Sequence, residues 1–98
     1  TNALLLNTTG ASNLAFGADS LDSNTTGDCN VAIGKNALCS NTTSARNTAV
    51  GAGSLENTTG AQNTSLGYLS LGSNTTGEYN IAIGIGYPNK NMLITRNM

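Results

Sequence analysis

The side chains that could carry out chemistry are few in this chain of 98 residues. Histidine is absent, which removes the usual base that activates a serine or cysteine nucleophile. Two cysteines are too few for a zinc site, which usually takes four ligands. Carboxylates can act in pairs as general acid and base, but those of this chain are scattered: Asp19, Asp22, Asp28, Glu56 and Glu78. We therefore expect no catalytic residues, no metal site and no cofactor.

Tyrosines are the best candidates for a binding surface. Exposed tyrosine rings stack on sugars and are common in protein interfaces. Tyr68, Tyr79 and Tyr87 all lie in the C-terminal third of the chain, at variable positions. They are candidate contacts to a glycan or a receptor, and ordinary surface or inter-chain packing is the alternative.

Asparagine also offers a modification chemistry. Six Asn-x-Ser/Thr sequons are present, at Asn7, Asn24, Asn41, Asn57, Asn63 and Asn74. Each is a glycan acceptor if the chain passes through a eukaryotic secretory route. The Asn-Thr-Thr triplet is also turn chemistry, because asparagine bonds its own downstream backbone, and we favour this interpretation.

These residues belong to an internal repeat. Asn-Thr-Thr recurs with spacings of 17, 17, 16 and 17 residues, and a five-residue block follows six residues after the start of each triplet. The blocks are Asn-Leu-Ala-Phe-Gly (13–17), Asn-Val-Ala-Ile-Gly (30–34), Asn-Thr-Ala-Val-Gly (47–51), Asn-Thr-Ser-Leu-Gly (63–67) and Asn-Ile-Ala-Ile-Gly (80–84). Such a period is too short for helical repeats, so each unit is predicted to be one coil of a parallel β-solenoid, with two short strands and two turns.

Two apolar ranks run through the repeat and form the predicted core. Alternate side chains of a strand point to opposite faces, so the large apolar residue of each block faces one way, and its Asn, Ala and Gly face the other. The first rank is Phe16, Ile33, Val50, Leu66 and Ile83, and the second is Leu4, Leu21, Leu38, Leu55 and Leu71. The third unit lacks one residue between Leu55 and Asn57, which we place in a turn, since a deletion within a strand would reverse the faces of all following residues.

Cys29 and Cys39 occupy different positions of the repeat. The position of Cys29 tolerates any residue type, as its equivalents show: Ser12, Arg46, Gln62 and Tyr79. We expect two solvent-facing free thiols, with a disulfide between adjacent coils as the alternative. Secreted fibres usually pair or avoid cysteine, which favours a virion assembled in a reducing cytoplasm.

Composition excludes two classes of partner. Four Lys and Arg with a net charge of −1 cannot form the basic surface of a nucleic-acid binder. The longest apolar run is Ala3–Leu6, far below the roughly 20 residues of a membrane span, and there is no signal-peptide pattern. We expect neither nucleic-acid binding nor membrane insertion.

A thin core indicates that several chains share one. Ile, Leu, Val and Phe number 19 among 98 residues, which is low for a globular domain, and an open solenoid exposes strand edges. The small face of each block, with Asn, Ala and Gly, suits the close approach of a neighbour. We therefore expect a parallel homo-oligomer, most simply a trimer around a common axis.

The blocks Asn30–Gly34 and Asn80–Gly84 resemble the head repeats of trimeric autotransporter adhesins of the Yersinia adhesin type. The longer unit, with Ala-Leu and Asn-Thr-Thr-Gly, is also similar to repeats in phage tail fibres and in attachment proteins of large viruses. The resemblance covers about residues 3–84. It implies a left-handed parallel β-roll packed as a trimer, although the adhesin repeat is nearer 14 residues, so the second half of the coil must differ here.

This resemblance implies a structural and adhesive function without catalysis. The expected protein is a segment of a trimeric fibre on a virion or a bacterial cell surface, attached to a host-surface glycan or protein receptor. Residues 1–84 form the predicted solenoid of about five coils. Residues 85–98 are a C-terminal cap or the start of a next module, with a last strand over Met92–Thr95.

Two other function classes stay open. A monomeric ice-binding solenoid would use threonine ladders (Thr8, Thr25, Thr42, Thr58 and Thr75) as a flat array. Adjacent threonines point their hydroxyls apart, and the shortened unit breaks the regularity of the array. An enzyme acting on surface polysaccharide would need a cluster of carboxylates, which the sequence does not show.

Overall fold

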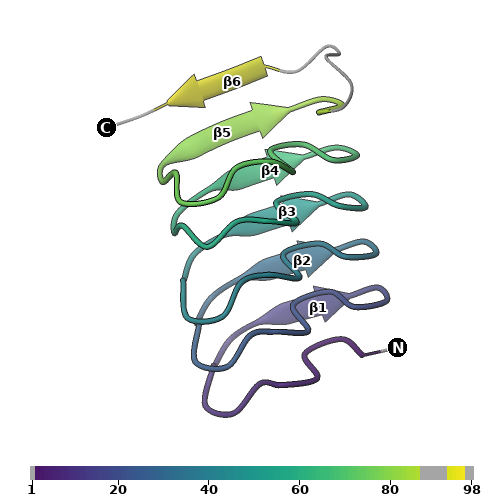
Figure 1. The fold of residues 1–98 in the computed structure, drawn as a ribbon, viewed down its shortest axis with the longest axis vertical. Coiled ribbons are helices and arrows are strands. Elements are labelled where there is room, and N and C mark those ends of the chain that lie inside the picture. The colour runs from purple at the N-terminus through teal and green to yellow at the C-terminus, as the bar shows by residue number, and fades with distance from the viewer. Residues whose placement is uncertain (1, 87–92, 97–98) are drawn as a thin grey trace.

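The computed structural model describes residues 2–86 and 93–96, which form one stack of coils (Figure 1). Each complete repeat supplies one short strand. The strands are β1 (Leu14–Phe16), β2 (Val31–Ile33), β3 (Thr48–Val50), β4 (Thr64–Leu66), β5 (Asn80–Ile83) and β6 (Leu93–Arg96). The described residues contain no helix. The predicted all-β solenoid with coils of about 17 residues is confirmed.

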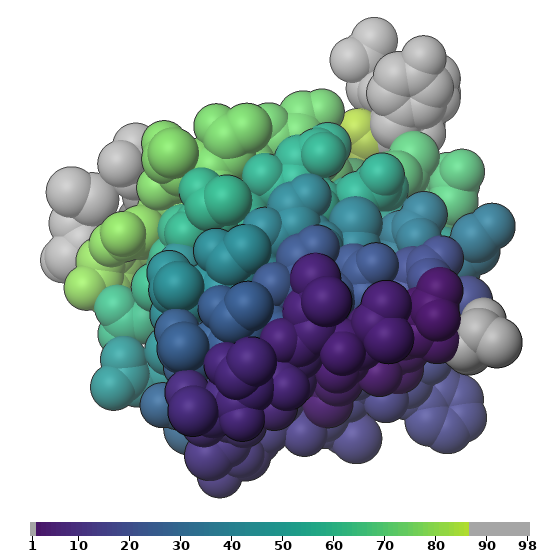
Figure 2. Space-filling view, turned by 60° about the horizontal axis from the view of Figure 1, so that its bottom comes forward, coloured from purple at the N-terminus to yellow at the C-terminus, as the bar shows by residue number. Residues whose placement is uncertain are grey.

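Equivalent positions of the repeat lie directly above one another. Strands β1 to β5 pair in parallel and in sequence order, so that Ala15, Ala32, Ala49, Ser65 and Ala82 form one row. The N-terminal coil lies at the front of the space-filling view, and the later coils are stacked behind it as successive layers (Figure 2). Every residue type repeated in the sequence therefore becomes a ladder along the stack.

Strand β6 differs from the others in direction. It pairs antiparallel with β5, with Ile83 opposite Leu93 and Asn80 opposite Arg96. Its bounds are shifted by one residue from those of the last strand predicted from the sequence, Met92–Thr95. The edge of β5 that would otherwise be open is covered by a reversed strand, which limits further pairing at this end.

The second half of each coil is a series of turns, and the prediction of a second strand there was wrong. The repeated leucine adopts a left-handed backbone, with φ of 54° at Leu4, 49° at Leu21, 53° at Leu38, 52° at Leu55 and 52° at Leu71. This conformation costs an L-residue about 1–2 kcal/mol. The stack maintains it, because the Leu38 N–H donates to the Ser54 carbonyl of the next coil at 3.1 Å while the leucine side chain is fully buried.

Glycine is required where each strand ends. Gly34 has a φ of +127°, and a Cβ on it would lie 2.6 Å from the carbonyl carbon of Gly51 in the next coil. Both the backbone angle and the space therefore exclude a side chain. The same geometry recurs at the other blocks and makes the chain turn sharply out of the sheet.

The two faces of the strands are arranged in the opposite way to the predicted core. The Ala of each block points into the coil, and Ala32, Ala49 and Ala82 are fully buried. The large apolar residue points outward, and Phe16 is 70% exposed. The coil is so narrow that alanine and the leucine rank fill its interior together. The small face is therefore not available to a neighbouring chain, and the prediction that a neighbour packs against it was wrong.

Asparagine ladders connect the coils inside the stack. In the first ladder, Asn24 Nδ2 donates to Asn7 Oδ1 at 2.8 Å, and Asn41 Nδ2 donates to Asn24 Oδ1 at 2.9 Å. In the second, the Asn47 amide Nδ2 donates to the Gly60 carbonyl at 2.8 Å, and its Oδ1 accepts the backbone N–H of Asn63 at 2.9 Å. Within the described residues, no buried polar side-chain atom lacks a partner. Hydrogen bonds thus hold the interior as much as apolar packing does.

The shortened third unit is accommodated at a different place from the one predicted. Thr58, not Asn57, is the buried residue three positions after Leu55, and its Oγ1 accepts from Asn74 Nδ2 at 2.9 Å. Asn57 is displaced to the surface. The deletion is absorbed in the bend over 58–60, which is one residue shorter than the bend over 24–27. A turn does absorb the missing residue, and the strands keep their register.

Candidate functional site

The described residues do not gather the side chains that usually bind a metal ion. None of their His, Cys, Asp and Glu side chains forms a group of three or more that could hold a metal ion. Of the candidate carboxylates, Asp28 accepts the Ala11 backbone N–H at 2.7 Å and Asp22 accepts the Ser23 hydroxyl at 3.4 Å.

The outer face of the sheet is an extended surface feature, which we call the apolar face. Strand register aligns two rows of side chains on it. The first row is Leu14, Val31, Thr48, Thr64 and Ile81, and the second is Phe16, Ile33, Val50, Leu66 and Ile83. At about 4.8 Å between neighbouring strands, the rows extend for about 19 Å from β1 to β5.

Exposure of this face is high for large apolar side chains. Phe16 is 70% exposed, Leu14 50%, Ile83 49% and Leu66 48%. Contiguous apolar patches of this kind mark protein–protein interaction sites more often than scattered surface leucines do. Sequence reasoning found the second row but assigned it to the interior, because alternation alone does not say which face of a strand points inward. It did not single out the first row.

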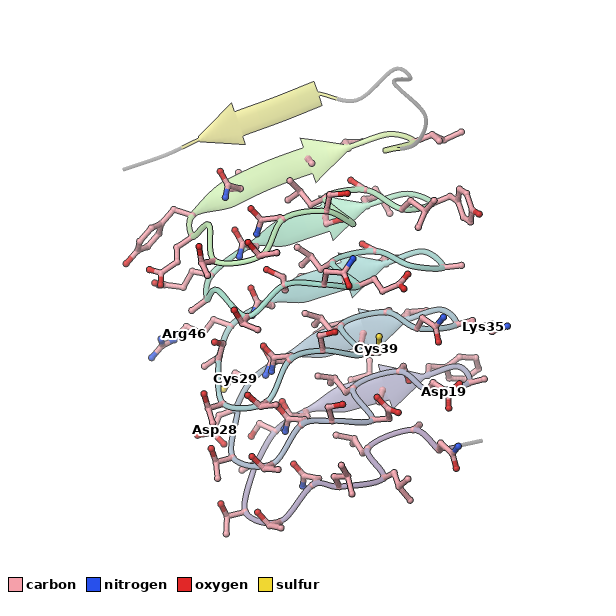
Figure 3. All side chains as sticks on the ribbon, in the orientation of Figure 1. Asp19, Asp28, Cys29, Lys35, Cys39 and Arg46 are labelled. Carbon is pink, nitrogen blue, oxygen red and sulfur yellow. The ribbon has the colours of Figure 1, made fainter. Side chains whose placement is uncertain are left out.

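Charged residues lie at the two edges of the apolar face. Asp28, Cys29 and Arg46 lie at the edge where the strands begin, and Asp19 and Lys35 lie at the edge where the strands end (Figure 3). In the described part of the chain, no ion pair forms between them: opposite ends of the strands separate Asp28 from Lys35, and Arg46 bonds Asp28 only through its backbone N–H, which donates to the Asp28 carbonyl at 3.1 Å. The face is thus apolar in its centre and polar at its edges, as protein interfaces are.

The candidate tyrosines are not brought together. Tyr68 follows the end of β4 and is 55% exposed, whereas Tyr79 precedes β5 and is 45% exposed. They lie at opposite ends of the strands and therefore at opposite edges of the apolar face. Tyr87 lies outside the described residues. The rings at 68 and 79 are accessible, but they do not form one binding site.

The thiols are free and differ in environment. Cys29 is exposed, and Cys39 is partly buried with its Sγ 3.6 Å from the Glu56 carbonyl oxygen. Burial raises the pKa of the Cys39 thiol, and the negative charges of Glu56, Asp22 and Asp19 act in the same direction, against a hydrogen bond with Ser40. Free thiols are as predicted from the sequence, although Cys39 is less open to solvent than expected.

Threonine ladders line the bends, and their hydroxyl groups take part in the stack. Thr8 Oγ1 donates to the Thr25 carbonyl at 3.0 Å, and Thr25 Oγ1 donates to the Thr42 carbonyl at 3.3 Å. Thr58 is buried, and the exposed Thr59 takes its place in the first threonine ladder, where its Oγ1 donates to the Thr75 carbonyl at 3.1 Å. These hydroxyl protons are used between coils, which lowers the capacity of the ladder to order water.

Sequon asparagines are mostly part of the interior. Asn24, Asn41 and Asn63 are fully buried and hydrogen-bonded, which favours their interpretation as turn and ladder residues. Asn57 is exposed because of the shortened bend. The repeated asparagines therefore serve the fold at nearly every position.

Comparisons with known proteins give no relative from which a function can be transferred. No family model, no curated protein and no solved structure matches this chain. The described residues contain no helix of the length and apolarity required to cross a membrane. The apolar face and its edges are therefore the observations from which a function has to be argued.

Proposed function

We propose that this chain is a structural and adhesive segment of a homotrimeric fibre that attaches a virus or a bacterium to a host surface, and that it catalyses no reaction. The observation that carries the proposal is the apolar face, which extends over five parallel strands. Water-exposed side chains such as Phe16 and Leu66 gain stability when a neighbouring chain covers them. A copy of the same chain offers a matching apolar face at the same height.

In the trimer that we propose, the chains meet through the apolar face and not through the face of small residues that the sequence predicted. Three copies with their apolar faces turned toward a common axis enclose eight apolar side chains from each chain in one continuous core. The stacked coils let such a core run along the axis, which gives a stiff fibre segment. The similarity to adhesin and tail-fibre repeats supports the same arrangement.

Adhesion then depends on residues that stay outside the core. The turn half of each coil faces away from the apolar face, and its exposed side chains, such as those of Thr43 and Asn57, are accessible to a host glycan or protein receptor. Tyr68 and Tyr79 lie at the edges of the face, where a neighbouring copy competes with a receptor for their rings. The segment contributes spacing and rigidity, and binding at its surface or at a distant tip completes attachment.

Solution mass is the first experiment. Light scattering after gel filtration should give three times the 9.9 kDa of one chain. A glycan-binding screen on the trimer then tests adhesion, and unchanged glycans after incubation test the absence of hydrolysis. A stable monomer would overturn the trimeric fibre. A monomer that also shows thermal hysteresis in a freezing assay would support an ice-binding solenoid instead.

A further inference from the structure

Opposite edges of the apolar face come together when copies surround an axis. All strands of one chain run in the same direction, and a rotation about the stacking axis preserves that direction. The end of a strand in one copy therefore meets the beginning of a strand in the next copy. Under a pure rotation, both belong to the same coil and lie at the same height. This argument rests on the proposed function, because it requires parallel copies around one axis.

Strand β2 carries opposite charges at its two ends. Asp28 precedes the strand and Lys35 follows it, and both residues are exposed. One Asp28 oxygen accepts the Ala11 N–H, but no hydrogen bond or ion pair in the described residues involves the Lys35 ammonium. Within one chain the two groups lie at opposite edges (Figure 3). Between copies related by a rotation, they lie at the same corner and height.

A shift of one coil along the axis removes this complementarity. If the strand ends of one copy met the strand beginnings one coil further toward the C-terminus, Lys35 would face Ala45, the repeat equivalent of Asp28, with the like charge of Arg46 beside it. If the shift were in the other direction, Lys35 would face Ala11, which is also uncharged. Of these three arrangements, only the unshifted one places opposite charges together, and this difference disfavours a shift of one coil.

We propose that the Asp28 carboxylate of one copy pairs with the Lys35 ammonium of the next copy at each corner of the trimer, and that this pair fixes the axial register of the chains. The apolar rows cannot fix the register, because they are nearly the same from coil to coil. Exposed ion pairs contribute little to stability, so their effect is on register and partner orientation.

Disulfide trapping tests this proposal, because Cys29 is adjacent to Asp28 and exposed. The variant carries Lys35→Cys with Cys39→Ser, so that only positions 29 and 35 have thiols. The two thiols of one chain are at opposite edges and cannot meet. A disulfide needs Cα atoms within about 7 Å, so oxidation should give covalent dimers and trimers on a non-reducing gel.

The matched control is Ala52→Cys with Cys39→Ser, which places the second thiol at the same edge one coil higher. Its cross-linking should be at least tenfold slower than that of the Lys35→Cys variant. Equal or faster cross-linking through position 52 would overturn the register. A trimeric mass without a link between positions 29 and 35 would overturn the pairing and leave the fibre proposal standing. A monomeric mass would overturn both.

Discussion

At the scale of single residues, asparagine acts as the connector between coils. Asn47 is fully buried, and its amide makes two hydrogen bonds to groups that no other side chain contacts, the Gly60 carbonyl and the Asn63 N–H. Few other side chains as small as that of asparagine carry both a hydrogen-bond donor and an acceptor. The abundance of asparagine in the sequence is therefore a consequence of the interior, where each one satisfies backbone groups of the next coil.

Removal of this connector should destabilise the fold strongly. Asn47→Ala leaves the Gly60 carbonyl and the Asn63 N–H buried without partners, at about 1–3 kcal/mol each. We expect a loss of about 2–5 kcal/mol in the free energy of unfolding, measured by urea denaturation. Asn57→Ala is the control, because Asn57 is exposed and donates only to the Gly72 carbonyl. Equal losses for the two variants would contradict the ladder.

The Cys39 thiol gives a pH-dependent contribution. Its pKa in the folded chain is raised above the ordinary 9.0, chiefly by burial. The unfolded chain therefore releases this proton at a lower pH, and the contribution of the thiol to stability is present below pH 9.0 and is lost as pH rises through the folded value. Urea denaturation between pH 8 and 11 should show this decline, and Cys39→Ser should remove part of it. An unchanged slope in the variant would contradict the assignment.

At the scale of the coil, the third unit shows what one missing residue changes. Thr58 takes the place of a ladder asparagine and accepts from Asn74, but it has no amide to donate to Asn41. The ladder is interrupted at this point, although the strands on both sides keep their register. Strand register is therefore better protected than the side-chain ladder, because a bend can lose a residue and a strand cannot.

Insertion of a serine between Glu56 and Asn57 should repair the ladder. The coil then has the same Leu-x-Ser-Asn-Thr-Thr-Gly order as its neighbours, and the asparagine moves to the buried position. Each restored hydrogen bond contributes about 1 kcal/mol, so Tm should rise by several degrees in a thermal melt. The control adds a serine between Ser73 and Asn74, where the coil already has full length, and should lower Tm. A lower Tm for the first insertion would show that the shortened bend is the preferred state.

The sequence predicted the coil but not its shape in full. Period, parallel stacking and the bends followed from the asparagine and glycine positions, since each of these residues has a strong local preference. The left-handed leucines were not predictable, because Leu21 and Leu38 adopt this backbone only through hydrogen bonds to the next coil. The inner and outer faces were also misassigned. Hydrophobicity favoured Ile33 inside, whereas the width of the coil admits only Ala32.

At the scale of the whole molecule, a polar interior forces apolar residues outward. The coil buries asparagine, serine and alanine beside a single leucine rank, and the large apolar residues of strands β1 to β5 lie on the outer face of the sheet. A single chain therefore exposes surface that an assembly can bury. In the trimer that we propose, the apolar face would supply affinity, and Asp28 and Lys35 at its edges would supply register.

This division predicts different effects for one charge placed on two surfaces. Leu66→Glu puts a carboxylate in the middle of the apolar face, where three copies would bury it without a partner at a cost of several kcal/mol. The side chain is 48% exposed in the single chain, so the coil itself should keep its fold. We expect light scattering to give the mass of one chain while circular dichroism stays unchanged.

The control is Thr43→Glu, at an exposed bend position, which should remain trimeric. A trimeric Leu66→Glu variant would show that the apolar face lies outside the interface, and a loss of the circular dichroism signal would show that the face is required within each chain.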